Sequence, residues 1–229
     1  GEQAGWPHPL LPVADKLVEL GRSTDAVRLI RTRIKKNDVG VWPLREWLER
    51  FAEDAGDWTT VTELTWDAYR EFPSADGYRS LREAAERAGR WKDLRPMALR
   101  IAERSGRLDL YLRILLDDGA IDLAIARLRN APSKSLDPDV RRDVALAAAT
   151  NDPESGIALL WENVELLILR RDRNAYRSAC DDLVQLRELY RKLYRKLYRK
   201  AEWQQALTSL LEDNTRLRAL RAELKVAGP

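Results

Sequence analysis

The residue types that most often perform catalysis are nearly absent from this chain of 229 residues. It contains one histidine, His8, and one cysteine, Cys180. A general base of the usual kind is a histidine held beside a nucleophile, and His8 lies in a proline-flanked terminal stretch that indicates no such pairing. A single cysteine rules out a disulfide within the chain and a cysteine-based zinc site contained in it. We interpret Cys180 as a packing residue and expect no catalytic residue, metal site or cofactor.

Charged residues make up 34% of the chain, with Lys+Arg 40 against Asp+Glu 37 and a formal net charge of +3. The carboxylates alternate with arginines at helical spacing, which is typical of ion-paired helix surfaces rather than of a paired-carboxylate active site. No glycine-rich phosphate loop and no nucleophile elbow occurs in the sequence. These patterns give no positive support for an enzyme, and we predict a non-catalytic protein.

Neither a signal peptide nor a transmembrane segment is indicated. The first residues, GEQAGWPHPL, have no basic start and no apolar centre, and no run of about 18 apolar residues follows. We expect a cytoplasmic protein without membrane contact. Because the chain begins with glycine rather than methionine, we also expect it to be part of a longer protein.

Residues 189–200 read LYRKLYRKLYRK, which places basic side chains beside tyrosines at a four-residue period. At 100° per residue the leucines and tyrosines share one helix face and the basic residues share the other. We favour a lengthened amphipathic helix. The alternative is a nucleic-acid-binding module that uses the basic face of residues 187–200, since such a face could hold phosphates. The basic face comprises Arg191, Lys192, Arg195, Lys196, Arg199 and Lys200.

Helical periodicity runs through almost the whole chain, and no stretch alternates as a strand would, so the fold class is all-α. Gly21, Gly56, Gly89 and Gly119 each separate two amphipathic segments and recur every 30 to 35 residues. A glycine in that place closes a helix, and a period in that range indicates a helical repeat. Apolar or small residues recur at fixed positions around these glycines: Val13, Leu48, Leu81 and Tyr111 eight before, Leu17, Ala52, Ala85 and Leu115 four before, and Ala26, Val61, Leu94 and Ala124 five after.

The segment AEDAGDWTTVTELTWDAYREFPSAD, with Gly56, Trp58, Ala68 and Pro73, resembles the helix-turn-helix of a tetratricopeptide repeat. The resemblance implies a right-handed α-solenoid, here of about six antiparallel hairpins, whose groove is lined by the first helix of each hairpin. Trp58, Trp91 and Trp203 share one repeat position, so we predict that they pack between neighbouring helices, whereas Trp6 and Trp42 are candidates for exposed contacts.

The expected organisation has three parts. Residues 1–131 hold repeats 1–4, residues 132–138 form a loop or hinge, and residues 139–229 hold repeats 5 and 6. In the fifth repeat, Asn-Asp-Pro-Glu should start the second helix. In the sixth, we expect Asn174 to cap the first helix. A change of helical phase predicts a break near Arg199 to Glu202, followed by one helix from Trp203 to Val226.

The chain's last residues, RLRALRAELKVAGP, preceded by LRELYRKLYRK and AEWQQAL, resemble the C-terminal region of bacterial SWIM zinc-finger proteins. That resemblance implies the helical tail of a larger protein in a nucleic-acid or protein-interaction context. The cysteine and histidine motif of the family is missing here, so no zinc ligand is carried over.

We therefore predict a helical-repeat scaffold that mediates protein–protein interaction, acts as a monomer and binds a protein or peptide partner, acidic or phosphorylated at the C-terminal end. The first-helix positions carried over from tetratricopeptide repeats are Glu46, Arg50, Arg79, Glu83, Arg113 and Arg142, with Arg191 and Arg195 in the last repeat.

Overall fold

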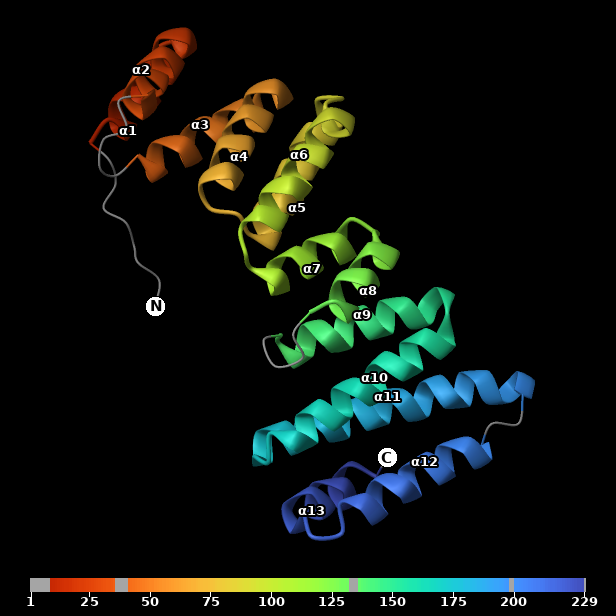
Figure 1. Cartoon of the computed structure of the whole chain (residues 1–229). Coiled ribbons are helices and arrows are strands. Elements are labelled where there is room, and N and C mark those ends of the chain that lie inside the picture. The colour runs from red at the N-terminus through yellow and green to blue at the C-terminus, as the bar shows by residue number, and fades with distance from the viewer. Residues whose placement is uncertain (1–8, 36–40, 132–135, 198–199, 229) are drawn as a thin grey trace. The chain divides into compact units, whose positions relative to one another are not determined.

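The structure is a computed structural model that describes residues 9–35, 41–131, 136–197 and 200–228, apart from the side chains of residues 193–200. His8 and Trp6 lie outside the described residues. Within the described ranges all regular structure is α-helical (Figure 1). The 13 helices found there are α1 (Leu11–Glu19), α2 (Ser23–Lys35), α3 (Trp42–Asp54), α4 (Trp58–Glu71), α5 (Ala75–Arg87), α6 (Trp91–Arg104), α7 (Leu108–Asp117), α8 (Ile121–Arg129), α9 (Pro138–Asn151), α10 (Pro153–Leu169), α11 (Arg173–Leu197), α12 (Lys200–Asp213) and α13 (Arg218–Ala227).

The helices belong to two compact units, Gly1–Ser105 and Gly106–Pro229. In the first unit each helix from α1 to α5 packs against the next one along the chain. In the second, α7, α8 and α9 pack together, α10 lies between α9 and α11, and α12 and α13 both contact α11. Sequential packing of this kind fits a helical-repeat arrangement. Residues 132–135 lie outside the described ranges, so the expected hinge stays a prediction.

The glycines that were expected to close helices do so. At Gly56 the backbone φ is 69°, a left-handed value that glycine adopts without steric cost. The Gly56 N–H donates to the Glu53 carbonyl at 2.9 Å, and the Asp57 N–H donates to the Ala52 carbonyl at 2.8 Å. Asp57 then caps α4, because its carboxylate accepts from the Thr60 N–H at 3.0 Å. The same left-handed conformation occurs at Gly21, Gly89 and Gly119, and also at Gly106, which the sequence pattern missed.

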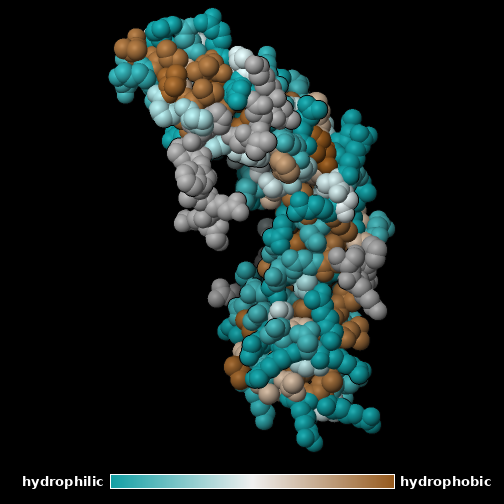
Figure 2. All heavy atoms as spheres, turned by 90° about the vertical axis from the view of Figure 1, so that its left-hand side faces the viewer, coloured by the Kyte–Doolittle hydropathy of each residue, from teal (hydrophilic) through white to brown (hydrophobic). Residues whose placement is uncertain are grey.

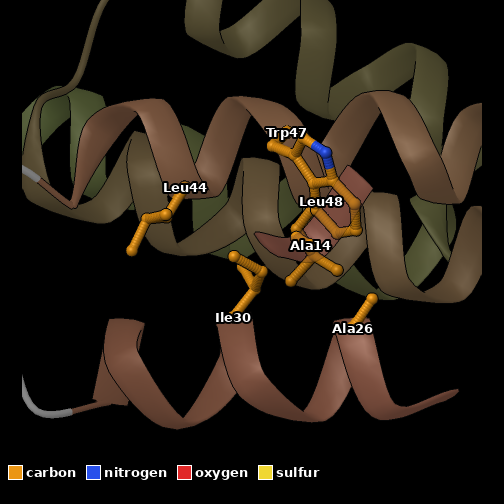
Figure 3. Close-up of a cluster of buried hydrophobic side chains, with 6 residues drawn as sticks. All are labelled: Ala14, Ala26, Ile30, Leu44, Trp47 and Leu48. Carbon is orange, nitrogen blue, oxygen red and sulfur yellow. The ribbon is translucent and has the colours of Figure 1, made fainter. Parts of the chain in front are cut away.

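The first core lies between α1, α2 and α3, whose apolar faces point toward one another (Figure 3). It comprises Ala14 of α1, Ala26 and Ile30 of α2, and Leu44, Trp47 and Leu48 of α3. Of the apolar residues at repeated positions, Val13 is an exception at 47% exposure. No helix precedes α1 in the described residues to cover that face.

The tryptophans at the shared repeat position do pack between helices. The Trp58 ring of α4 lies under the guanidinium of Arg87 in α5, with 4.2 Å between Cζ and the ring centroid. Trp91 meets Tyr78 edge to face at 5.3 Å between ring centroids. Trp203 is buried, and its ring centroid lies 5.9 Å from that of Trp161.

Helix α10 begins where the sequence indicated, with the Asp152 carboxylate accepting from the Ser155 N–H at 3.2 Å. The expected cap at Asn174 is wrong. Arg171 adopts a left-handed backbone with φ 57°, which ends α10 without a glycine. Asp172, which directly precedes α11, therefore caps that helix in place of Asn174, because its carboxylate accepts from the Ala175 N–H at 2.8 Å.

The prediction of a single helix from Trp203 to Val226 is also wrong, because this segment is divided between two helices, α12 and α13. The Asn214 side chain donates to the Leu210 carbonyl at 2.9 Å, and the Leu217 N–H donates to the Asn214 carbonyl at 3.1 Å, forming a turn. This turn brings α13 back against α11, where Leu220 and Leu224 are buried. The break expected near Arg199 to Glu202 stays a prediction, because residues 198–199 lie outside the described residues; α11 is described as far as Leu197 and α12 from Lys200.

Candidate interaction surfaces

In the first unit, the predicted groove residues lie exposed on α3 and α5. Glu46 and Arg50 are one turn apart on α3, and neither forms an ion pair within the described residues. On α5, Arg79 pairs with Asp76, and Glu83 accepts from Arg87 at 2.9 Å. Each helix therefore presents both signs of charge.

The outer face of α3 carries more acid than the groove prediction included. Glu46, Glu49 and Glu53 lie within 60° of one another at 100° per residue. Partial burial of Glu49, together with the like charges of Glu53 and Glu46, raises the pKa of its carboxyl. None of the three forms an ion pair with a cation in the described part of the chain.

An exposed aromatic pair lies where α3 begins and α4 ends. Trp42 is 53% exposed and Phe72 is 60% exposed, with 6.1 Å between their ring centroids. The Arg45 guanidinium lies 5.5 Å from the Trp42 ring centroid and donates to Glu71 at 2.7 Å. Trp42 was expected to be exposed, but Phe72 was missed. Its signal was a single aromatic residue between a charged helix end and Pro73.

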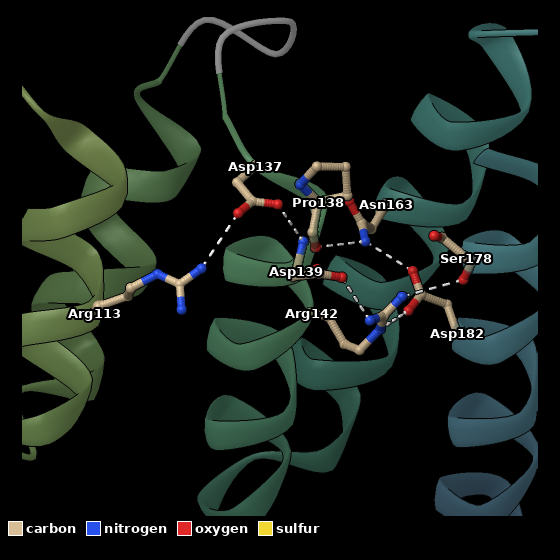
Figure 4. A network of polar contacts seen from close by, with 8 residues as sticks. All are labelled: Arg113, Asp137, Pro138, Asp139, Arg142, Asn163, Ser178 and Asp182. Carbon is tan, nitrogen blue, oxygen red and sulfur yellow. Dashed lines mark hydrogen bonds and ion pairs between the residues drawn. The ribbon is translucent and has the colours of Figure 1, made fainter. Parts of the chain in front are cut away.

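In the second unit, Arg113 and Arg142 both contact acidic side chains (Figure 4). Arg113 of α7 lies 3.2 Å from an Asp137 oxygen, and the same carboxylate caps α9 by accepting from the Asp139 N–H at 3.0 Å. Arg142 of α9 donates to Asp182 of α11 and, at 2.8 Å, to Asp139. Both predicted groove residues therefore have partners within the fold.

Asp182 is the centre of this network and is fully buried. Besides Arg142, its carboxylate accepts from Asn163 Nδ2 at 2.7 Å, and that nitrogen also donates to the Pro138 carbonyl at 3.1 Å. Burial raises the pKa of Asp182, and the hydrogen bonds from Arg142 and Asn163 oppose that rise. The network joins α9, α10 and α11, so its evident role is to hold these three helices together.

Beside the network is a cavity of about 330 Å³ between α9 and α10. Its lining includes Leu166, Leu167, Leu169, Asn163, Arg141 and Arg170. Arg141 is only 4% exposed, and the closest oxygen of Glu162 is 3.7 Å from its guanidinium. Burial lowers the pKa of Arg141, the charge of Glu162 opposes this, and the like charge of Arg170 adds to it. Sequence reasoning chose Arg142 and missed this neighbour.

The described part of the LYRK helix is amphipathic, as expected. Leu183, Leu186 and Tyr190 are buried, whereas Arg191 and Lys192 are exposed. Arg191 pairs with Glu188 at 3.0 Å. The side chains of the remaining basic-face residues, Arg195, Lys196, Arg199 and Lys200, lie outside the described residues.

Cys180 is buried on α11, and its burial raises the pKa of the thiol to about 11. The thiolate is the reactive form of cysteine, so the environment of Cys180 disfavours reactivity and confirms the packing role.

Apolar surface also gathers over the first hairpin, α1 and α2 (Figure 2). Val13 and Leu20 are exposed there, and a hollow of about 770 Å³ is lined by Leu10, Leu17 and Leu29 among other residues.

The described residues contain no group of three or more His, Cys, Asp or Glu side chains placed to hold a metal ion. None of the helices in those ranges is both long and apolar enough to cross a lipid bilayer.

The chain matches no model of a known protein family and no curated protein.

Proposed function

We propose that this chain is a non-catalytic helical-repeat scaffold that binds a protein partner, with its hairpins arranged as a right-handed solenoid of the tetratricopeptide kind. Sequential helix packing within each unit and the recurring glycine caps support this proposal. In such repeats the apolar faces are buried between neighbours, and one helix of each hairpin stays available to a partner.

The observation that carries the proposal is the exposed aromatic pair, Trp42 and Phe72. Aromatic residues dominate the energetics of protein interfaces, and adjacent exposed ones mark interaction sites. Each ring is half or more exposed, so covering it would remove on the order of 100 Å² of apolar surface from water. At about 25 cal/mol per Å² this is worth roughly 2–3 kcal/mol for each ring.

The charges beside the pair define the chemistry that a partner needs. Glu46, Glu49 and Arg50 follow Trp42 along α3 and have no ion pairs within the described ranges. A partner segment that seats an apolar side chain on the aromatic pair and carries both signs of charge would complement this surface. The acidic ligand, the nucleic-acid alternative and the SWIM-protein context all concern the C-terminal end and stay predictions.

The test is affinity capture with chemical cross-linking, comparing proteins bound by the wild type and by surface variants. Trp42→Ala removes the aromatic contact, and the double variant Arg50→Glu, Arg79→Glu reverses charge on α3 and α5. Arg70→Glu is the matched control, because Arg70 is exposed on α4, outside the proposed groove. We expect a bound protein that is lost with both test variants and kept with the control. A bound protein that tolerates Trp42→Ala and the double variant contradicts the proposal.

A further inference from the structure

An open hollow of about 340 Å³ lies between α12 and α13, the last two helices of the described residues (Figure 1). Three leucines line it: Leu207 and Leu211 of α12, which are half-buried, and Leu224 of α13, which is buried. Arg221 and Lys225 of α13 also line the hollow, and both are exposed to water. The hollow therefore combines apolar surface with positive charge on its α13 side.

The positive charge belongs to a row of cations along α13. Arg218, Arg221 and Lys225 follow one another at three- and four-residue intervals, and they lie within about 60° of one another at 100° per residue. None of the three forms an ion pair within the described ranges. The one acidic residue of α13, Glu223, lies on the other side of the helix and pairs with Arg173 at 2.7 Å.

Such a row is unfavourable in the protein alone. Like charges three or four residues apart on a helix repel each other, whereas opposite charges at this spacing attract. Cations on other helices of the chain have acidic neighbours at this spacing. On α5, Arg87 pairs with Glu83 at 2.9 Å, and on α11, Arg191 pairs with Glu188 at 3.0 Å. The row on α13 has no such neighbour, so a negatively charged partner would relieve its repulsion.

The leucines beside the row indicate which negatively charged partner fits. A nucleic-acid backbone or a phosphate group would meet the cations but leave the leucines in contact with water. An amphipathic helix with acidic residues beside its apolar side would cover the leucines and also meet the cations. The acids at the end of α12, Glu212 and Asp213, lie 100° or more around that helix from Leu207 and Leu211, and neither lines the hollow. They therefore do not oppose an acidic partner there.

We propose that the hollow between α12 and α13 docks an acidic amphipathic helix of a partner protein, whose apolar side covers the three leucines and whose carboxylates pair with the row of cations on α13. This surface differs from the predicted groove for an acidic ligand, which used Arg191 and Arg195 of α11. It lies in the second unit and does not involve the interaction surface of α3 and α5, so either proposal can fail alone.

The experiment is a fluorescence-anisotropy titration of the whole chain with three labelled peptides of about 14 residues, a length at which an isolated helix is marginally stable. The first peptide has leucines three and four residues apart on one side and glutamates beside them. The second has glutamine in place of every glutamate, and the third has alanine in place of every leucine. We expect the first peptide to bind and the other two to bind at least about 10-fold more weakly, because each lacks one of the two kinds of contact.

Variants of the protein locate the binding. Arg221→Gln combined with Lys225→Gln should weaken binding of the first peptide about 5-fold, because two exposed ion pairs are lost. The matched control combines Arg191→Gln with Lys192→Gln, which removes the same charges from exposed positions of α11 outside the hollow and should bind as the wild type does. All four residues are exposed, so neither variant removes a buried contact.

Three results would overturn the proposal. The first peptide does not bind, either altered peptide binds as tightly as the first, or the α13 double variant keeps the affinity of the wild type. Equal losses in the two double variants would also overturn it, because they would show attraction to the overall charge of the protein rather than docking in the hollow.

Discussion

Replacing Gly156 with alanine should destabilise the second unit, although alanine is normally the better helix former. Gly156 lies in α10 against α9, and a Cβ atom there would be 2.4 Å from Ala149 Cβ and 2.6 Å from Ala149 Cα. Within a helix, Gly→Ala alone stabilises by about 1 kcal/mol. Overpacking costs about 1–3 kcal/mol and sometimes more. Because the clash includes backbone, α9 and α10 must separate, which loosens contacts of fully buried residues such as Val144 and Leu160. We expect a net loss of about 2 kcal/mol.

Urea denaturation followed by circular dichroism measures this loss, and hydrogen exchange of the α9 and α10 amides localises it. Gly77→Ala in α5 is the control, since its Cβ would meet only side chains, Ser74 Oγ at 2.9 Å and Tyr69 Cδ2 at 3.5 Å. Adding Ala149→Gly to Gly156→Ala should restore only part of the stability, because the Ala149 backbone atoms remain. If Gly156→Ala is as stable as the wild type, the close approach of these helices is refuted.

Four further outcomes are expected. Asp57→Ala should lower the free energy of unfolding by about 1 kcal/mol, as loss of a cap does. Hydrogen bonds from Thr60 lower the pKa of Asp57 in the folded state, so the stability from this carboxylate is lost as pH falls through that pKa. Urea titrations at several pH values should therefore show that the stability of Asp57→Ala depends less on acid than that of the wild type. Arg142→Ala leaves the buried Asp182 without its cation and should cost about 3–5 kcal/mol at neutral pH. Burial raises the pKa of Asp182, so the stability that depends on its protonated form is lost as pH rises. At acidic pH Asp182 is protonated and uncharged, so the cost of Arg142→Ala should be smaller there. Cys180 should react with a thiol reagent at pH 8 only after unfolding, because its burial raises the pKa to about 11. A titration of the protein with fluorescent single-stranded DNA should show negligible binding. The nucleic-acid alternative would be favoured instead if the DNA binds with an affinity that falls steeply with salt and if this binding is lost when the basic face is changed to glutamine. The residues to change are Arg191, Lys192, Arg195, Lys196, Arg199 and Lys200.

The hairpins could be predicted because their signals are local. A glycine in the left-handed conformation closes a helix wherever it occurs, and the second helix of each predicted hairpin begins two residues after it, at Ser23, Trp58, Trp91 and Ile121. Helical phase is also local, and for this reason the buried side of α11 was identified correctly over its described residues.

The missed boundaries lack such a signal. Arg171 adopts a conformation that glycine would normally supply, and nothing in its residue type indicates this. The turn at Asn214 divides a segment with good helix propensity throughout. What favours the turn is burial of Leu220 and Leu224 against α11, together with the ion pair of Glu223 with Arg173 at 2.7 Å. Both are tertiary contacts, which override local preference.

The candidate site shows the same limit at the level of single side chains. Arg141 and Arg142 are adjacent, and one helical step of 100° gives them different neighbours. Arg142 meets Asp182, whereas Arg141 lines the cavity beside Leu167. Position within a repeat predicted which arginine would face outward, but the side chains of α10 and α11 determine which of the two is already paired. In a helical-repeat protein a charged residue is therefore a ligand candidate only once its partners on the neighbouring helices are known, and Arg142, which pairs with Asp182 and Asp139, shows why.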